Sequence, residues 1–171
     1  MVAMKQITNY SRPERWILAV LRIIIGWHIL YEGFSKLLVP NWSSASFLLE
    51  SKWILKGFAE WIMSNPAVLS TVDFLNIWGL IAIGIGLILG LFTRAAAISG
   101  AILLLLYYLS NPPLIGLEYS LPTEGNYLIV SKTLIEVVAL VVLAVFPTGL
   151  IAGLDIYLAK VWNRNKNKME G

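Results

Sequence analysis

The sequence contains no cysteine and a single histidine, His28. Without cysteine the chain forms no disulfide, holds no iron–sulfur cluster, attaches no c-type haem and performs no thiol redox chemistry. One histidine without cysteine also argues against a metal or bis-histidine haem site, so we predict no metal. Any redox centre must therefore be borrowed from another molecule.

Charge is also scarce, because Asp, Glu, Lys and Arg make up only 13% of the chain. The net charge of +3 comes from Lys and Arg that lie just outside apolar segments. This placement is typical of residues that set membrane topology, so we predict no nucleic-acid partner. The first apolar run has no small-residue cleavage pattern after it, and we expect it to be a retained signal-anchor.

Hydrophobic residues are abundant instead, at 58% of 171 residues, which is too apolar for an ordinary soluble domain and predicts an integral membrane protein. Short connections between apolar runs favour an all-α, antiparallel four-transmembrane-helix bundle. We also expect an amphipathic interfacial helix in the first loop and a short one after the fourth helix. The resulting single domain spans 1–162, with transmembrane helices at about 16–38, 72–92, 95–109 and 127–146, interfacial helices at about 44–64 and 150–162, and a basic cytoplasmic tail at 163–171.

Lys and Arg are concentrated at the N-terminus, at Arg94 and in the tail, whereas the loop 111–126 has none. By the positive-inside rule, both termini are expected in the cytoplasm of a bacterial or archaeal cell, with the protein in the cytoplasmic (inner) membrane.

The first apolar run carries Arg22, His28, Glu32 and Lys36. At about 100° per residue these four side chains share roughly a third of the helix circumference. A charge in the membrane costs about 2.5 to 3.5 kcal/mol even on the lenient insertion scale, so this stripe should face other helices or a wet cavity. It is the first candidate for a functional site.

Polar residues on other helices are expected at the same depth. Lys132 and Glu136 lie four residues apart on the last helix, and Asn76 lies near the start of the second. Together with the stripe they predict a pocket that opens outward. The competing interpretation is that each pair of opposite charges only neutralises itself to allow insertion. Arg22 lies deeper and is predicted to be structural, as a partner of Asp155 or of a backbone carbonyl.

Three segments resemble the DoxX family of membrane proteins, and specifically its DoxD-like branch. They are WILAVLRIIIGWHILYEGFSK at 16–36, GIGLILGLFTR at 84–94, and EGNYLIVSKTLIEVVAL at 124–140. The resemblance implies a four-helix membrane protein that acts as the large subunit of a thiosulfate:quinone oxidoreductase. Such a subunit passes electrons from thiosulfate to membrane quinone with a small DoxA partner.

On this hypothesis Glu32, Glu136 and His28 are catalytic and carry protons to or from a quinone, which is a substrate. Lys36 and Lys132 attract an oxyanion such as thiosulfate, and Asn76 joins them in binding substrate. Aromatic rings from Trp27, Tyr31 and Tyr127 flank the quinone ring. The expected partners are membrane lipid, quinone, a DoxA-like small subunit or another redox protein, and a second copy of the chain.

Two other functions are compatible with the same residues, and neither requires the chain to be an enzyme. One is a non-catalytic membrane scaffold or assembly protein of a redox complex, in which the charge pairs serve packing alone. The other is a small-solute transporter, since an outward-facing polar pocket suits that class too, although four helices without an inverted repeat are few for alternating access.

Overall fold

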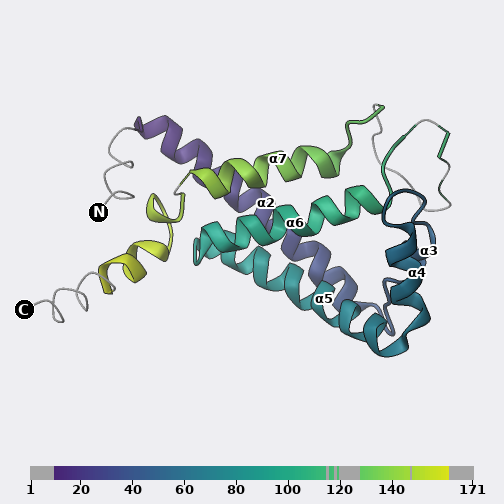
Figure 1. Cartoon of the computed structure of the whole chain (residues 1–171). Helices are drawn as coiled ribbons and strands as arrows, with labels where there is room; N and C mark the ends of the chain where they lie inside the picture. Colours follow the sequence, from purple (N-terminus) through teal and green to yellow (C-terminus); the bar gives the residue numbers. More distant parts are fainter. Residues whose placement is uncertain (1–9, 115, 118, 120–127, 147, 162–171) are drawn as a thin grey trace, which may run out of the picture.

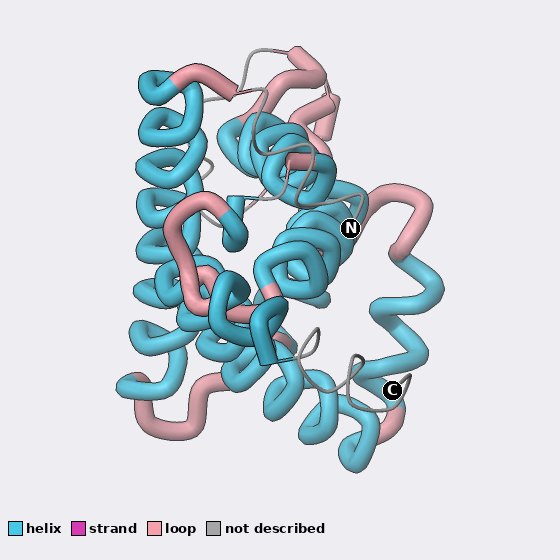
Figure 2. The backbone as a smooth tube through the Cα atoms, turned by 90° about the vertical axis from the view of Figure 1, so that its left-hand side faces the viewer, coloured by secondary structure: helices cyan, strands magenta, loops and turns pink. Residues whose placement is uncertain are grey.

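The computed structural model describes residues 10–114, 116–117, 119, 128–146 and 148–161, and within them the chain is helical with no strand (Figures 1 and 2). Three of the helices, α2, α5 and α6, are long and apolar enough to cross a membrane. The helices are α2 (Arg12–Leu38), α3 (Ala45–Leu49), α4 (Lys56–Ser64), α5 (Pro66–Leu89), α6 (Thr93–Ser110), α7 (Lys132–Val145) and a 3₁₀ turn (Thr148–Leu150), and residues 155–161 are also helical.

The start of α2 is specified locally by Ser11 and Glu14. Ser11 is the N-cap, and its hydroxyl accepts a hydrogen bond from Glu14 N at 3.4 Å. The Glu14 carboxylate in turn accepts one from Ser11 N at 2.8 Å, which completes a capping box. Pro13 occupies the first turn, where its missing N–H has no intrahelical partner to lose. The helix therefore begins at Arg12, before the apolar run that starts at Trp16.

The closest packing in the bundle is between α2 and α5, which run antiparallel (Figure 1). A Cβ atom on Gly84 of α5 would stand 2.7 Å from the Leu30 backbone of α2, and one on Gly33 would stand 3.0 Å from Ile81 N. Only glycine permits this approach. Gly79 on the same helix is different, since a Cβ there would meet nothing within 4 Å.

The α5–α6 turn and α7 complete the packing of the four longer helices α2, α5, α6 and α7. Gly90 ends α5 in the left-handed conformation at φ 65°, and α6 follows after two residues. In turn α7 packs along α6, with Ser131 as its N-cap accepting from Leu134 N at 3.3 Å. We expected this last helix over 127–146, whereas α7 begins at Lys132 and ends at Val145, and residues 128–131 before it are not helical. The shared core consists of Ile25, Ile29, Leu80, Ile83, Leu87, Ala97, Ala101, Leu104, Val137, Leu140 and Leu143.

The first loop forms two helices, α3 and α4, where one interfacial helix over 44–64 was predicted. They lie at the end of the bundle opposite to the start of α2 (Figure 1). Ser44 anchors α3 to α5, because its N–H and hydroxyl both donate to Asp73 Oδ1, at 2.8 and 2.5 Å. Leu48, Ala59 and Ile62 are buried in a second, smaller core beneath these helices.

Candidate functional site

His28, Glu32 and Lys36 lie on successive turns of α2, each four residues from the next. The Lys36 ammonium is 2.6 Å from Glu32 Oε2, and its side chain is only 17% exposed. Lys36 also lies over the Trp42 ring, 5.8 Å from the ring centroid. The Lys36 end of this row of side chains is thus held in place by an ion pair and by an aromatic neighbour.

His28 makes the contact that joins two helices distant in sequence. Its Nδ1 contacts Oε1 of Glu136 on α7, and the two side chains are 32% and 17% exposed. The contact is not an aligned hydrogen bond among the described residues, and the two groups form an ion pair when His28 is protonated. Glu136 is therefore tied to α2 across the helix interface.

Electrostatic contacts extend this pair into a cluster. The Glu32 carboxylate is attracted by Lys36, by His28 and by Lys132 at the start of α7. The structure thus brings together five of the predicted site residues from the first and last helices: two acids, two lysines and the histidine. We refer to His28, Glu32, Lys36, Lys132 and Glu136 as the acid–base cluster.

A buried polar pair from the middle helices lies next to the acid–base cluster. Asn76 of α5 is 9% exposed, and its amide lies beside the hydroxyl of Tyr107 on α6. The negative charge of Glu32 also acts on this hydroxyl. Within the described residues, Asn76 Oδ1 and Tyr107 Oη make no well-aligned hydrogen bond. Our sequence reasoning missed Tyr107 as a site residue. The sequence does contain an indication: Tyr107 follows four consecutive leucines, 103–106. A tyrosine at the end of such an apolar run needs a polar neighbour for its hydroxyl.

Several other predicted residues are placed differently. Trp27 and Tyr31 are each 63% exposed, so they lie on the outer surface of α2 and not inside the bundle. Tyr127 lies outside the described residues. The α3 helix covers the site from one end, because the Phe47 ring packs edge-on against Tyr107 with centroids 5.5 Å apart.

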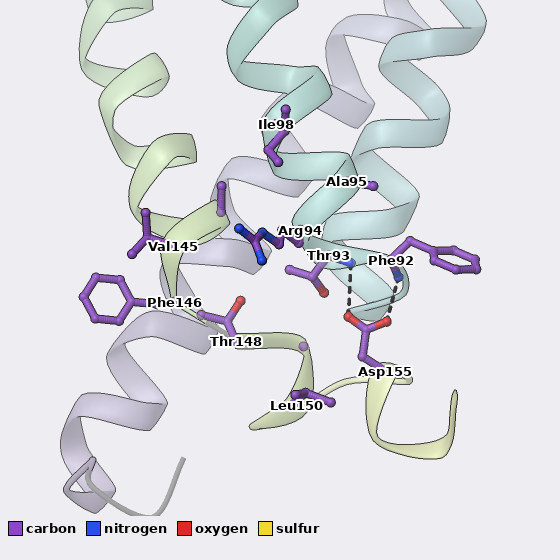
Figure 3. A pocket seen from close by; sticks show the side chains of 12 residues that line it. Phe92, Thr93, Arg94, Ala95, Ile98, Val145, Phe146, Thr148, Leu150 and Asp155 are labelled. Atoms are coloured by element: carbon purple, nitrogen blue, oxygen red, sulfur yellow. Dashed lines mark hydrogen bonds between the residues drawn. The ribbon is translucent and has the colours of Figure 1, made fainter. Parts of the chain in front are cut away.

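Arg22 and Asp155 lie toward the other end of the bundle. Arg22 is 1% exposed, and its Nη2 donates to the Ala152 carbonyl at 2.5 Å. Asp155 attracts Arg22 electrostatically and accepts from Phe92 N at 2.7 Å and Thr93 N at 3.1 Å (Figure 3). These contacts join the segment after α7 to α2 and to the first turn of α6.

The fold and the acid–base cluster define a small helical protein with apolar, membrane-length helices and ionisable side chains gathered between them. The DoxX family model matches residues 17–110, more than half of the chain, so the chain belongs to the DoxX family of membrane proteins. The matched range includes His28, Glu32, Lys36 and Asn76 and ends before α7, which carries Lys132 and Glu136. No curated protein and no solved structure matches the chain.

Proposed function

We propose that this chain is the membrane subunit of a quinone-linked oxidoreductase of the DoxD-like type, and that the acid–base cluster is its proton-handling site. The observation that supports this most strongly is the contact between His28 Nδ1 and Glu136 Oε1, made across two helices inside a largely apolar bundle. A charge pair that serves insertion alone can be satisfied within one helix and needs no partner on another.

The proposed chemistry needs both protons and an electron donor. A quinone that is reduced to a quinol accepts two electrons and two protons. Two thiosulfate ions that join through a new S–S bond to form tetrathionate release those two electrons. His28, Glu32 and Glu136 supply the protons, and Lys36 and Lys132 attract the dianion. Trp27 and Tyr31, exposed on the outside of α2, offer aromatic surface where a quinone would enter from the lipid.

The proposal includes a membrane topology. We propose that α7 is a fourth span, so that both termini lie in the cytoplasm of a bacterial or archaeal cell. Its 14 helical residues cover about 21 Å, less than the roughly 30 Å hydrocarbon core. Local thinning and the adjoining residues make up the difference, as for other short spans. A DoxA-like subunit or another redox protein, or a second copy of the chain, completes the complex.

The test is thiosulfate-dependent reduction of a soluble quinone by the purified protein in nanodiscs, with and without a DoxA-like partner. Glu136→Gln and Lys132→Met should each lower the rate, the former by about 10²- to 10⁴-fold if the carboxylate transfers a proton. Glu60→Gln is the matched control, because that carboxylate is 61% exposed and pairs with Lys56 of the same helix at 3.9 Å. An inactive wild-type protein with every partner, or equal rates for Glu136→Gln and Glu60→Gln, would refute the proposal.

A second function, a scaffold for other redox subunits, is favoured by one surface. Phe58 and Trp61 on α4 are 55% and 53% exposed and stack with ring centroids 5.8 Å apart. Such an exposed aromatic pair suits a partner or the membrane interface. If the chain is only a scaffold, Phe58→Ser with Trp61→Ser should abolish co-purification of a partner, while Glu136→Gln leaves the function intact.

A further inference from the structure

A continuous groove follows the outer side of α6 and α7. A cavity of about 570 Å³ lies at the end where α6 begins, and a second of about 410 Å³ lies further along the same two helices. The two cavities share four lining residues, Arg94, Ile98, Ala144 and Val145, so they connect. We refer to them together as the α6–α7 groove. It is separate from the acid–base cluster, none of whose members lines it.

The groove is apolar along most of its length. Beyond Ile98 its walls are formed by Leu105, Val137 and Val141, among other small or aliphatic side chains. Ile98 and Val141 are 44% and 49% exposed, so this part opens onto the surface that faces lipid. From Ile98 to Leu105 the α6 wall rises about 10 Å. That shape suits one extended hydrocarbon chain.

The end near the start of α6 is polar. Arg94 extends between α6 and α7 there, and it has no ion pair or hydrogen bond to any described residue (Figure 3). Two threonine hydroxyls line the same end: Thr93 is 3% exposed and Thr148 is completely buried. Neither hydroxyl finds a hydrogen-bond partner in the described part of the chain. This end therefore combines one uncompensated cation with two hydroxyls that lack partners.

Among the described residues that line this end, Asp155 is the single acid, and it does not neutralise Arg94. Both oxygens of Asp155 accept from backbone N–H groups, at 2.7 Å from Phe92 and 3.1 Å from Thr93, and Arg22 lies close enough to attract the carboxylate. The negative charge of Asp155 thus already interacts with the N-terminus of α6 and with Arg22. The Arg94 guanidinium remains available to an anion from outside the chain.

We propose that the α6–α7 groove is a binding site for an anionic phospholipid. Its phosphate accepts from Arg94 and from the hydroxyls of Thr93 and Thr148, and one acyl chain lies in the apolar part. A guanidinium matches phosphate geometry with paired N–H donors, and basic pockets between spanning helices bind anionic headgroups. A free phosphate ion would leave the apolar part empty, and a neutral quinone would leave Arg94 without a counter-charge.

The test uses the whole chain, stripped of lipid in detergent, with bound lipid counted by native mass spectrometry. Phosphatidylglycerol should bind about tenfold more tightly than phosphatidylcholine with the same acyl chains, because only the former brings a net negative charge to Arg94. Arg94→Gln should remove that preference. Arg12→Gln, an exposed arginine at the same end of the bundle, should keep it.

A second variant tests the apolar part. Ile98→Trp should fill the groove and weaken both lipids by about tenfold, the value of roughly two buried methylenes. Val138→Trp, on an exposed position of α7 outside the groove, should change neither. Two wild-type results would overturn the proposal without any variant: equal affinity for the two lipids, or inorganic phosphate that displaces phosphatidylglycerol at the concentration at which it binds alone. The second result would identify a free-anion site.

Discussion

Gly84 sits where the backbones of α2 and α5 come closest. A methyl group there would stand 2.7 Å from both Cα and N of Leu30, which are backbone atoms that cannot turn aside. Gly84→Ala must therefore push the two helices apart. We expect it to destabilise the folded protein by about 1 to 3 kcal/mol, the usual cost of overpacking, measured as a lower midpoint of unfolding in mixed micelles.

Gly79→Ala is the matched control on the same helix. A methyl group at residue 79 would meet nothing within 4 Å, so no clash arises. Alanine also has a helix propensity better than that of glycine by up to about 1 kcal/mol. The Gly79→Ala protein should be as stable as the wild type or slightly more so. A loss of stability in Gly79→Ala as large as that in Gly84→Ala would contradict the prediction, because it would show that the contact with Leu30 is not the cause.

The sequence predicts which residues belong to the acid–base cluster better than it predicts which of them contact one another. His28, Glu32 and Lys36 share a face because helical periodicity is a local property. The contact between His28 and Glu136 depends on the rotation and register of α7 against α2, which no local pattern encodes. Tyr107 escaped prediction for the same reason: its relation to Asn76 exists only after α5 and α6 have packed.

At the scale of elements, α6 begins where a distant residue caps it. Its N-cap position is Phe92, at φ 48° and without a side-chain acceptor, and the Asp155 carboxylate accepts from the N–H groups of Phe92 and Thr93 instead. Asp155→Ala should cost about 1 to 2 kcal/mol of stability, as loss of a cap does, and it also removes an electrostatic partner of buried Arg22. Thermal unfolding followed by circular dichroism measures this loss.

Asp155→Asn separates the two contributions. The amide oxygen can still accept one hydrogen bond at the start of α6, while the negative charge beside Arg22 is gone. If capping dominates, Asp155→Asn should lose less than half as much stability as Asp155→Ala. If the two variants lose equal stability, the charge beside Arg22 is the main contribution and capping is secondary.

Helix ends were harder to predict than helices. The amphipathic pattern in the first loop continues from Phe47 to Ile62, so it predicts a single helix. The structure breaks it between α3 and α4, where buried Ser51 donates to the Ser110 carbonyl at the end of α6, at 3.2 Å. That bond joins residues 59 positions apart in the sequence. Tertiary contact thus overrides the local pattern at this point.

At the scale of the whole molecule, the number of spans decides where the chain's ends lie. The start of α2 and the helical residues 155–161 are at one end of the bundle, and α3 and α4 are at the other (Figure 1). If α7 crosses the membrane with α2, α5 and α6, that arrangement places Arg12 and Lys160 on the same side. With only three spans they would lie on opposite sides, so the two topologies make different predictions.

The absence of native cysteine makes this measurable with single-cysteine variants in intact cells. Arg12→Cys, Lys56→Cys and Lys160→Cys each replace an exposed side chain. A membrane-impermeant maleimide should label only Lys56→Cys, because the proposed topology places α4 outside the cell and both Arg12 and Lys160 inside it. After permeabilisation all three should react equally. Labelling of Lys160→Cys but not Arg12→Cys in intact cells would show that α7 does not span, and would remove Glu136 from the membrane site proposed for it.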